Sequence, residues 1–266
     1  MSISRRTLLQ VTAASASGSL LAGCADGHPS GAAPATSEDA TGSPGTADRA
    51  ASPAASAPPG PPPLRPGLPA QIAHGPRDRP QLALTFHGQG EPALATALLA
   101  EAERAGARVT VLAVGSWLDS YPQLARRVLD GGHELGNHTQ THADIDAMDA
   151  AAATAEIEGC ARRLRRLTGS QGRWFRPSRT RNATPLVVSL ARRAGYPHLL
   201  SYDVDPLDYT DPGAAKVRAA VAAAAGPGSV VSLHFGHAGT VAALPGILDD
   251  LHRRGLRAVT TSELLT

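Results

Sequence analysis

From Gln81 to the end of the chain, short apolar runs alternate with longer segments whose apolar residues recur at helical spacing. The apolar runs predict strands at Leu82–Phe86, Val109–Val114, His133–Gly136, Trp174–Arg176, Leu199–Val204, Val230–His234 and Ala258–Thr260. The segments between them predict helices at Pro92–Ala105, Pro122–Leu129, Ala147–Leu167, Pro185–Ala194, Pro212–Ala224 and Val241–Arg254, with a final half-turn at Glu263–Leu265. Strands that alternate with helices pair in parallel through crossover helices. The pattern therefore predicts an α/β domain of about seven strand–helix units over residues 80–266.

Polar residues follow the ends of five predicted strands, and their distribution separates two possible architectures. These residues are His87, His138 with His142, Arg176, Asp205 with Asp208, and His234. In a barrel the strand ends converge on one rim, whereas a doubly wound sheet concentrates its chemistry at one switch point. Five separate polar ends favour an incomplete (β/α) barrel. No glycine-rich nucleotide fingerprint follows any predicted strand.

Residues 1–23 predict an export signal rather than folded structure. The pair Arg5-Arg6 followed by Leu8-Leu9 resembles a twin-arginine signal, and Leu21-Ala22-Gly23-Cys24 resembles a bacterial lipobox. We therefore expect cleavage before Cys24, lipidation of its sulfur, and a protein held by that lipid on the outer face of the cytoplasmic membrane. The alternative is an ordinary secretory signal with a chance cysteine.

Residues 24–79 predict a disordered tether between this anchor and the folded domain. Residues 25–69 hold 11 of the 22 prolines, and no aromatic residue occurs before Phe86. Such a segment buries too little apolar surface to offset its ordering entropy. Lysine and arginine exceed aspartate and glutamate by 25 − 23 = 2, and Arg5 with Arg6 supplies this excess. A neutral mature chain argues against a nucleic-acid partner.

Cysteine content excludes a disulfide framework, since the chain has only Cys24 and Cys160. Cys160 lies in a helical pattern between Ile157 and Leu164, which predicts a buried, inert thiol.

The segment from Gly132 to His142 carries the strongest chemical signal, Gly-His-Glu-Leu-Gly-Asn-His-Thr-Gln-Thr-His. His138 and His142 are four residues apart, so a helical turn would bring both imidazoles to one side. Two neutral ring nitrogens suit a divalent metal, and zinc is the metal that this chemistry favours. The alternative is a pair of surface histidines at the start of a helix.

This segment resembles the metal-binding motif of the NodB-homology polysaccharide deacetylases, carbohydrate esterase family four. The family's other motifs are matched in order over residues 82–266, at Leu84-Thr85-Phe86, Phe175-Arg176-Pro177, Asp205-Pro206-Leu207-Asp208-Tyr209 and Ser232-Leu233-His234. The resemblance implies an incomplete (β/α) barrel and a metal-dependent hydrolase that removes acetyl groups from a polysaccharide or peptidoglycan.

The first motif departs from the family, because His87 and Gly88 stand where the family has two aspartates. In the family the first aspartate is the catalytic base and the second is a metal ligand. Gly88 has no side chain to replace a carboxylate. His87 has an unperturbed pKa of about 6.5 and could act as the base, or it could complete a three-histidine metal site, but not both. The third motif also departs, with Ser178-Arg179 in place of a proline and an aromatic residue.

The resemblance implies roles for the remaining polar residues. His234 would protonate the leaving amine or alcohol, and Asp205 or Asp208 would keep His234 protonated. Arg176 would orient the base. The leading hypothesis is an exported, lipid-anchored deacetylase of a cell-envelope glycan. The alternative, permitted by the altered first motif, is an inactive barrel that binds glycan or a cell-wall partner.

Overall fold

The computed structural model describes residues 62–266. The predicted export signal, the lipidation site at Cys24 and the tether up to residue 61 lie outside the described residues. No helix within residues 62–266 combines the length and the apolar character needed to cross a membrane.

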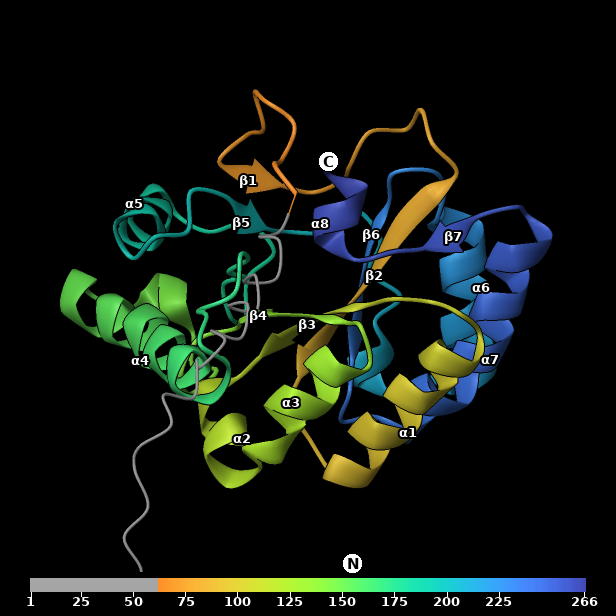
Figure 1. Cartoon of the computed structure of the whole chain (residues 1–266), viewed down its shortest axis with the longest axis horizontal. Coiled ribbons are helices and arrows are strands. Elements are labelled where there is room, and N and C mark those ends of the chain that lie inside the picture. Colours follow the sequence, from red (N-terminus) through yellow and green to blue (C-terminus); the bar gives the residue numbers. More distant parts are fainter. Residues whose placement is uncertain (1–61) are drawn as a thin grey trace, which may run out of the picture. The chain divides into compact units, whose positions relative to one another are not determined.

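Strand β2 (Gln81–Gly88) is the centre of the fold (Figure 1). It pairs in parallel with β3 (Thr110–Ala113), with β6 (Val230–His234) and, near its start, with β7 (Arg257–Ala258). Strand β4 (Glu134–Asn137) pairs in parallel with the other edge of β3. Five residues in the middle of β2, Leu82–Phe86, are buried, as an apolar run between two neighbouring strands requires.

The remaining side of the strand layer is joined by isolated parallel bridges rather than by a continuous ladder. These bridges are Asn137–Phe175, Phe175–Leu199 and Val204–Val231. The short strand β5 (Leu199–Leu200) also pairs in parallel with β1 (Gln71–Ile72). The predicted α/β class with parallel strands is confirmed.

Two of the predicted strands are wrong in extent. Trp174–Arg176 forms only the bridge at Phe175, and Leu199–Val204 is a strand only over its first two residues. The buried Arg176 side chain donates to the backbone oxygens of Leu200 and Ser201, so a side chain as well as the backbone joins these two segments. The last predicted strand ends early, at Ala258, because Thr260 caps the helix that follows.

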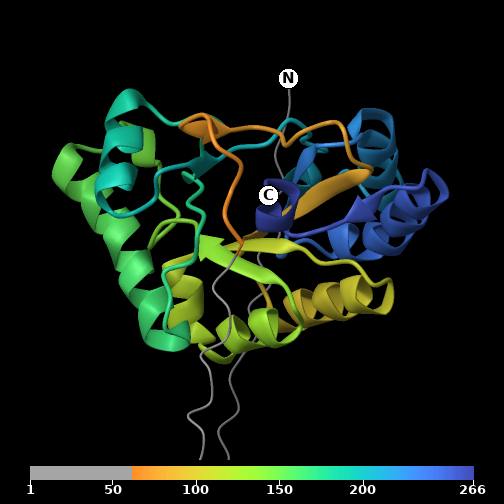
Figure 2. The ribbon, with the colours of Figure 1, turned by 45° about the horizontal axis from the view of Figure 1, so that its top comes forward.

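Helices surround the strands (Figures 1 and 2), with α4 and α5 on one side, α6 and α7 on the opposite side, and α1, α2 and α3 along a third. They are α1 (Pro92–Arg104), α2 (Gly115–Ser120), α3 (Gln123–Asp130), α4 (Ala150–Thr168), α5 (Pro185–Arg193), α6 (Ala214–Ala224), α7 (Ala238–Arg253) and α8 (Thr261–Leu264). Two 3₁₀ turns, η1 (Ile145–Ala147) and η2 (Asp208–Thr210), lie in the connections. Helix α2 was not predicted, since six residues are too few to show a period.

The ends of α4 illustrate how local chemistry sets the helix boundaries. Asp149 precedes the helix and its carboxylate accepts from Ala152 N at 2.8 Å. Gly169 ends it in the left-handed conformation, with φ 83°.

Cys160 lies on the inner face of α4, fully buried, and donates to the backbone oxygen of Ala113. The predicted burial of Cys160 is confirmed, and burial raises the pKa of this thiol to about 12.

The folded region begins before residue 80, so the predicted tether is wrong for residues 62–79. Ile72 is fully buried in β1, and Leu64 and Leu68 pack against the same apolar cluster. The backbone N of Arg65 donates to Leu265 O at 2.9 Å, which ties this segment to the C-terminus. These three apolar residues lie at intervals of four. The proline-rich composition around them concealed this pattern in the sequence.

We predict that a chain beginning at residue 80 is less stable than one beginning at residue 62. Removing residues 62–79 exposes the surface beneath Ile72, Leu64 and Leu68 and the free edge of β5. The free energy of unfolding should fall by at least about 3 kcal/mol, from the apolar area lost. Chemical denaturation of both chains measures this difference, and equal midpoints would show that the segment contributes nothing.

Candidate active site

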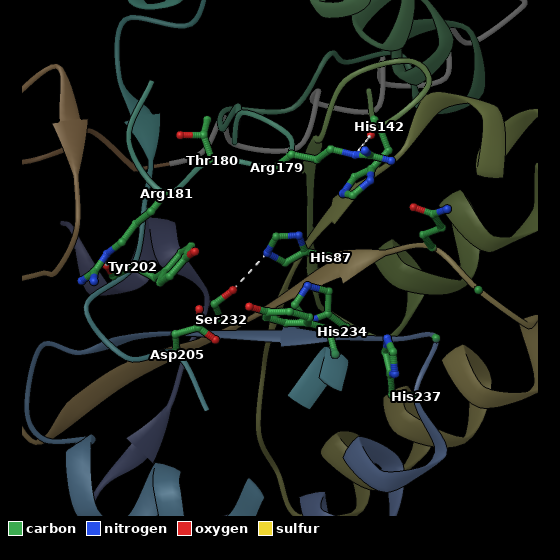
Figure 3. A pocket seen from close by; sticks show the side chains of 14 residues that line it. His87, His142, Arg179, Thr180, Arg181, Tyr202, Asp205, Ser232, His234 and His237 are labelled. Carbon is green, nitrogen blue, oxygen red and sulfur yellow. Dashed lines mark hydrogen bonds between the residues drawn. The ribbon is translucent and has the colours of Figure 1, made fainter. Parts of the chain in front are cut away.

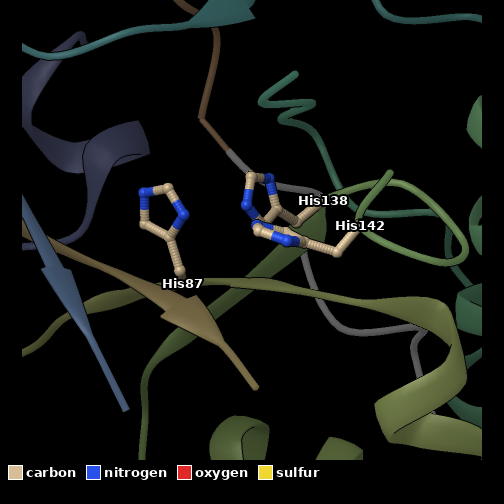
Figure 4. A group of neighbouring side chains, drawn as sticks. All are labelled: His87, His138 and His142. Carbon is tan, nitrogen blue, oxygen red and sulfur yellow. The ribbon is translucent and has the colours of Figure 1, made fainter. Parts of the chain in front are cut away.

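Three histidines converge at the carboxyl ends of the strands (Figure 4). His87 lies near the end of β2, and His138 and His142 lie in the loop after β4. Each offers one ring nitrogen, and these three nitrogens lie within 4.8 Å of one another. The rings of His87 and His138 meet edge to face, with centroids 4.4 Å apart.

Hydrogen bonds occupy one ring nitrogen of His138 and one of His87. The other ring nitrogen of each faces the interior of the cluster. His138 Nδ1 donates to the backbone oxygen of Arg176 at 2.9 Å, which leaves Nε2 deprotonated, buried and without a partner. His87 Nε2 shares a hydrogen bond of 3.0 Å with Ser232 Oγ, and its Nδ1 is likewise buried and unpartnered. Unpartnered buried nitrogens are costly unless something binds them, so the donor set fits a zinc-like divalent ion.

Electrostatics keeps the three rings neutral. Burial lowers the pKa of His87 well below its usual range, and His138, His234 and Arg176 add to the effect by opposing a further positive charge. Burial likewise lowers the pKa of His138 well below its usual range. The pKa of His142 is also lowered, by burial and then by the nearby Arg179. Metal ligation needs neutral imidazoles, and these surroundings supply them.

Gly88 leaves no room for the carboxylate that the family has at this position. A Cβ atom there would lie 2.9 Å from Val111 Cγ1 and 3.0 Å from Ala113 Cα on the neighbouring strand. An aspartate at position 88 would therefore require β2 and β3 to move apart. The neighbouring His87, by contrast, directs its free nitrogen toward His138 and His142. Of the two roles considered for His87, the geometry favours metal ligand over base.

The loop that carries His138 and His142 is not helical, so the expected helical turn is wrong. Thr139 and His142 have φ of 68° and 60°, which a helix excludes. Asn137 Oδ1 accepts from Thr139 N at 2.9 Å, and the Glu156 carboxylate accepts from both the N and Oγ1 of Thr141 at 2.8 Å. Local side-chain acceptors thus replace helical hydrogen bonds and bring the two imidazoles together.

The segment after Arg176 holds this loop from the other side. Ser178 Oγ donates to the backbone oxygen of Ala143. Arg179 Nε donates to the backbone oxygen of His142 at 3.0 Å, and Arg179 itself has a φ of 59°. Ser178 and Arg179 are the two departures in the third motif, and each makes a hydrogen bond to the metal-site loop.

His234 lies directly beside the cluster. The register of β6 against β2 pairs His234 with His87, and their rings stack with centroids 4.2 Å apart. His234 Nδ1 donates to Asp208 Oδ1 at 2.7 Å. The buried Asp208 also accepts from His234 N at 2.8 Å and from Thr240 Oγ1 at 2.7 Å. This arrangement fixes the ring and leaves Nε2 available for proton transfer.

Asp205 and Arg176 do not have the contacts expected of them. Asp208, not Asp205, binds His234, and Asp205 accepts from Leu207 N at 3.0 Å instead. Arg176 is fully buried and makes no hydrogen bond to His87; its Nη2 donates to Thr85 Oγ1 at 2.8 Å. Burial lowers the pKa of Arg176 to about 10. Its guanidinium connects β2 to the segment at Leu200 and Ser201, its backbone oxygen accepts from His138, and its charge opposes protonation of His87.

These groups open into a cavity of about 570 Å³ (Figure 3). That volume suits a sugar-sized ligand. The lining residues are His87, Gln89, Gly90, His142, Arg179, Thr180, Arg181, Tyr202, Asp205, Tyr209, Ser232, His234, Gly236 and His237. Tyr209 is about half exposed and meets the His234 ring edge to face, which leaves an aromatic surface beside the His234–Asp208 pair.

Several residues of the site were missed from the sequence. Ser232 had a usable signal, since it lies two positions before His234 and alternate residues of a strand share one face. Ser178 was noted only as a departure in the third motif, and Glu156 and Thr240 gave no signal. Each comes from a different part of the chain and reaches the site through tertiary packing alone.

Comparison with known proteins points to one family. Residues 74–199 match the family model for polysaccharide deacetylases. A peptidoglycan-N-acetylglucosamine deacetylase of Bacillus cereus is 31% identical over 195 residues, which cover 71% of this chain and 90% of that protein. A chitooligosaccharide deacetylase of Rhizobium leguminosarum bv. trifolii is 32% identical over 164 residues, covering 59% and 69%.

Solved structures show the same fold. A family 4 carbohydrate esterase from Streptomyces lividans, in complex with acetate, has a TM-score of 0.63 and 26% identity, covering 67% of this chain and 91% of that chain. A CE4 family pseudoenzyme from Bacillus anthracis has a TM-score of 0.70 and 22% identity, covering 75% and 70%. A mutant of that pseudoenzyme with restored enzymatic activity also has a TM-score of 0.70, at 23% identity, covering 75% and 72%. At 22% and 23% identity these last two matches concern the fold alone.

We predict that Arg179→Ala weakens zinc binding about 10- to 100-fold, the usual effect of losing an outer contact that orients a ligand. Its Nε holds the backbone of His142, and without it the left-handed loop loses one support. Competition with a chromogenic chelator measures the affinity. Arg181→Ala is the matched control, because Arg181 lines the same cavity but its Nε binds Tyr202 O, away from the loop. Equal affinities in the two variants would contradict the prediction.

Proposed function

The chain belongs to the polysaccharide deacetylase family, and on this premise we propose that it removes acetyl groups from a cell-envelope glycan by metal-dependent hydrolysis. The observation that carries the proposal is the meeting of three neutral histidine nitrogens with the His234–Asp208 pair beside a cavity that His87, His142 and His234 line. Relatives named as peptidoglycan and chitooligosaccharide deacetylases support an acetylated glycan as the substrate.

His87 through Nδ1, His138 through Nε2 and His142 would hold the metal, with zinc as the expected ion. When bound, such an ion acts as a Lewis acid on the acetyl carbonyl and lowers the pKa of a coordinated water. Three protein ligands would be the number that catalytic zinc sites take from their protein.

Proton transfer falls to His234. With His87 among the ligands, the first motif supplies no base, and His234 is the titratable ring stacked against the cluster. Its Nε2 accepts a proton from the attacking water and then donates it to the leaving nitrogen or oxygen. Asp208 keeps the proton on Nδ1 and stabilises the charged ring in between, as the acid partner of a histidine base does in other hydrolases.

A second candidate function is glycan binding without turnover. The altered first motif favours it, because neither His87 nor Gly88 supplies the family's carboxylates. In that case the metal and the cavity serve recognition alone. Acetate release separates the two functions.

Export and anchoring are part of the proposal. The Arg5-Arg6 pair and Leu21-Ala22-Gly23-Cys24 support secretion by the twin-arginine route and lipidation of Cys24. A lipid there would hold the deacetylase on the outer face of the cytoplasmic membrane, next to the cell-wall glycan. A proline-rich tether between this lipid and the domain would let the domain reach glycan at a distance from the membrane.

We predict that His234→Ala lowers the rate of acetate release by about 10²–10⁴-fold, the usual cost of losing an acid–base group. Zinc content should stay at the wild-type level, because His234 is not a ligand. Acetate is measured enzymatically on acetylated chitooligosaccharides, peptidoglycan and acetylated xylan. The zinc content of the purified protein is measured in parallel by mass spectrometry.

The matched control is His237→Ala. His237 Nδ1 donates to Asp211 at 2.8 Å in the same cavity, but its ring is 5.9 Å from that of His234 and does not stack on His87. Loss of the His237 ring should lower the rate of acetate release by less than about tenfold.

His87→Ala should abolish both zinc binding and acetate release. If the wild type releases no more acetate than His234→Ala on any substrate, the binding function replaces the deacetylase.

We predict that Cys24→Ala shifts the protein from the membrane fraction to the soluble fraction of the cell envelope. The cysteine sulfur is the expected attachment point of the lipid, and no other residue can replace it. Fractionation followed by immunoblotting measures the distribution, with Cys160→Ala as the control that retains the anchor. A wild-type protein found entirely in the culture fluid would refute the anchor.

A further inference from the structure

Arg179 and Arg181 both line the cavity (Figure 3), Arg179 beside His142 and Arg181 beside Tyr202, and the proposed hydrolysis makes no use of their charge. Both are exposed, yet both are held in place. Arg179 Nε donates to His142 O and Arg181 Nε to Tyr202 O, each at 3.0 Å. The Arg181 guanidinium also lies over the Tyr202 ring, 5.3 Å from its centroid. Each side chain is anchored by its inner nitrogen, and the terminal nitrogens remain for a ligand.

No acidic side chain within residues 62–266 forms an ion pair with either arginine. Two other arginines at the surface of the domain differ. Arg127 binds both carboxylate oxygens of Glu103, and Arg218 binds both of Asp250. The paired arginines are satisfied within the fold, whereas the two in the cavity wall present their terminal nitrogens without an internal acid.

The charge of the cavity points the same way. Among the described lining residues Asp205 is the one carboxylate, and it accepts from Leu207 N. Two guanidinium groups and a divalent ion would therefore share the cavity lining with one carboxylate, because Asp208 is buried behind His234. A neutral acetylated sugar offers nothing to match this excess. A carboxylate or a phosphate matches it well, because the planar guanidinium fork binds either one through two parallel hydrogen bonds.

We propose that the Arg181 side of the cavity binds an anionic group of the substrate, so that the preferred substrate is an acetylated glycan bearing a carboxylate or a phosphate near the acetyl group. The inference rests on the proposed function and specifies its substrate class. Arg181 determines specificity and takes no part in the chemistry. Arg179 adds charge, but its bond to His142 also supports the metal site, so the test uses Arg181.

The experiment compares substrates that differ only in charge. Full-length zinc-loaded protein is assayed for kcat and KM on peptidoglycan fragments with the muramic acid carboxylate intact, and on the same fragments after its reduction to the alcohol. A phosphorylated wall glycan and neutral acetylated chitooligosaccharides complete the set. Arg181→Gln should raise KM about 10- to 100-fold for the charged substrates, as expected for a lost charge-assisted hydrogen bond. For the neutral substrates KM should be nearly unchanged.

Arg126→Gln is the control, because it removes the same net charge as Arg181→Gln. Arg126 is exposed on α3 and does not line the cavity. Its KM values should match those of the wild type. The charged substrate with the lower KM, carboxylate or phosphate, identifies the source of the anion. Equal KM for intact and reduced fragments, or an equal rise for both in Arg181→Gln, would overturn the inference.

Calorimetry with the same fragments keeps the two proposals apart. If no substrate releases acetate but intact fragments bind more tightly than reduced ones, and lose that advantage in Arg181→Gln, the anion subsite stands and the deacetylase fails. If intact and reduced fragments bind with equal affinity, the subsite is rejected.

Discussion

Strand β2 and its register against β3 and β6 determine where the chemistry lies. The parallel pairing of β2 with β6 sets His87 opposite His234, and the pairing with β3 brings Gly88 against Ala113. The first pairing stacks the His234 ring on the histidine cluster. The second closes the space that a side chain at position 88 would need. A slip of one residue would turn His87 to the other face of the strand and dismantle both arrangements.

The charges around the cluster divide the histidines into two kinds. His87, His138 and His142 have no carboxylate hydrogen-bonded to their rings, and burial with neighbouring cations keeps them neutral. His234 has the buried carboxylate of Asp208 at 2.7 Å. Neutral rings suit a metal, and a ring held by a carboxylate suits proton transfer. The same side chain thus serves two chemical roles, and its surroundings decide which.

The departures from the family motifs meet in space. His87 and Gly88 change the first motif, and Ser178 and Arg179 change the third, about 90 residues later in the chain. Both pairs contact the metal-site loop: His87 through its ring, and Ser178 and Arg179 through the backbone oxygens of Ala143 and His142. At the proposed metal site, a histidine stands beside the position where the family has a carboxylate, and two hydrogen bonds hold the backbone of the loop that carries His142.

The sequence by itself determined the alternation of strands and helices, the strand ends at which polar residues gather, and the buried Cys160. Apolar periodicity and local capping carry that information, since both depend on residues close together in the chain. Only the tertiary structure decided that Asp208 rather than Asp205 binds His234, that His87 faces His138 and His142, and that residues 62–79 belong to the fold. Each of these depends on contacts between residues far apart in the chain. Whether a side chain meets its partner is then set by strand register and close packing, which no local pattern encodes.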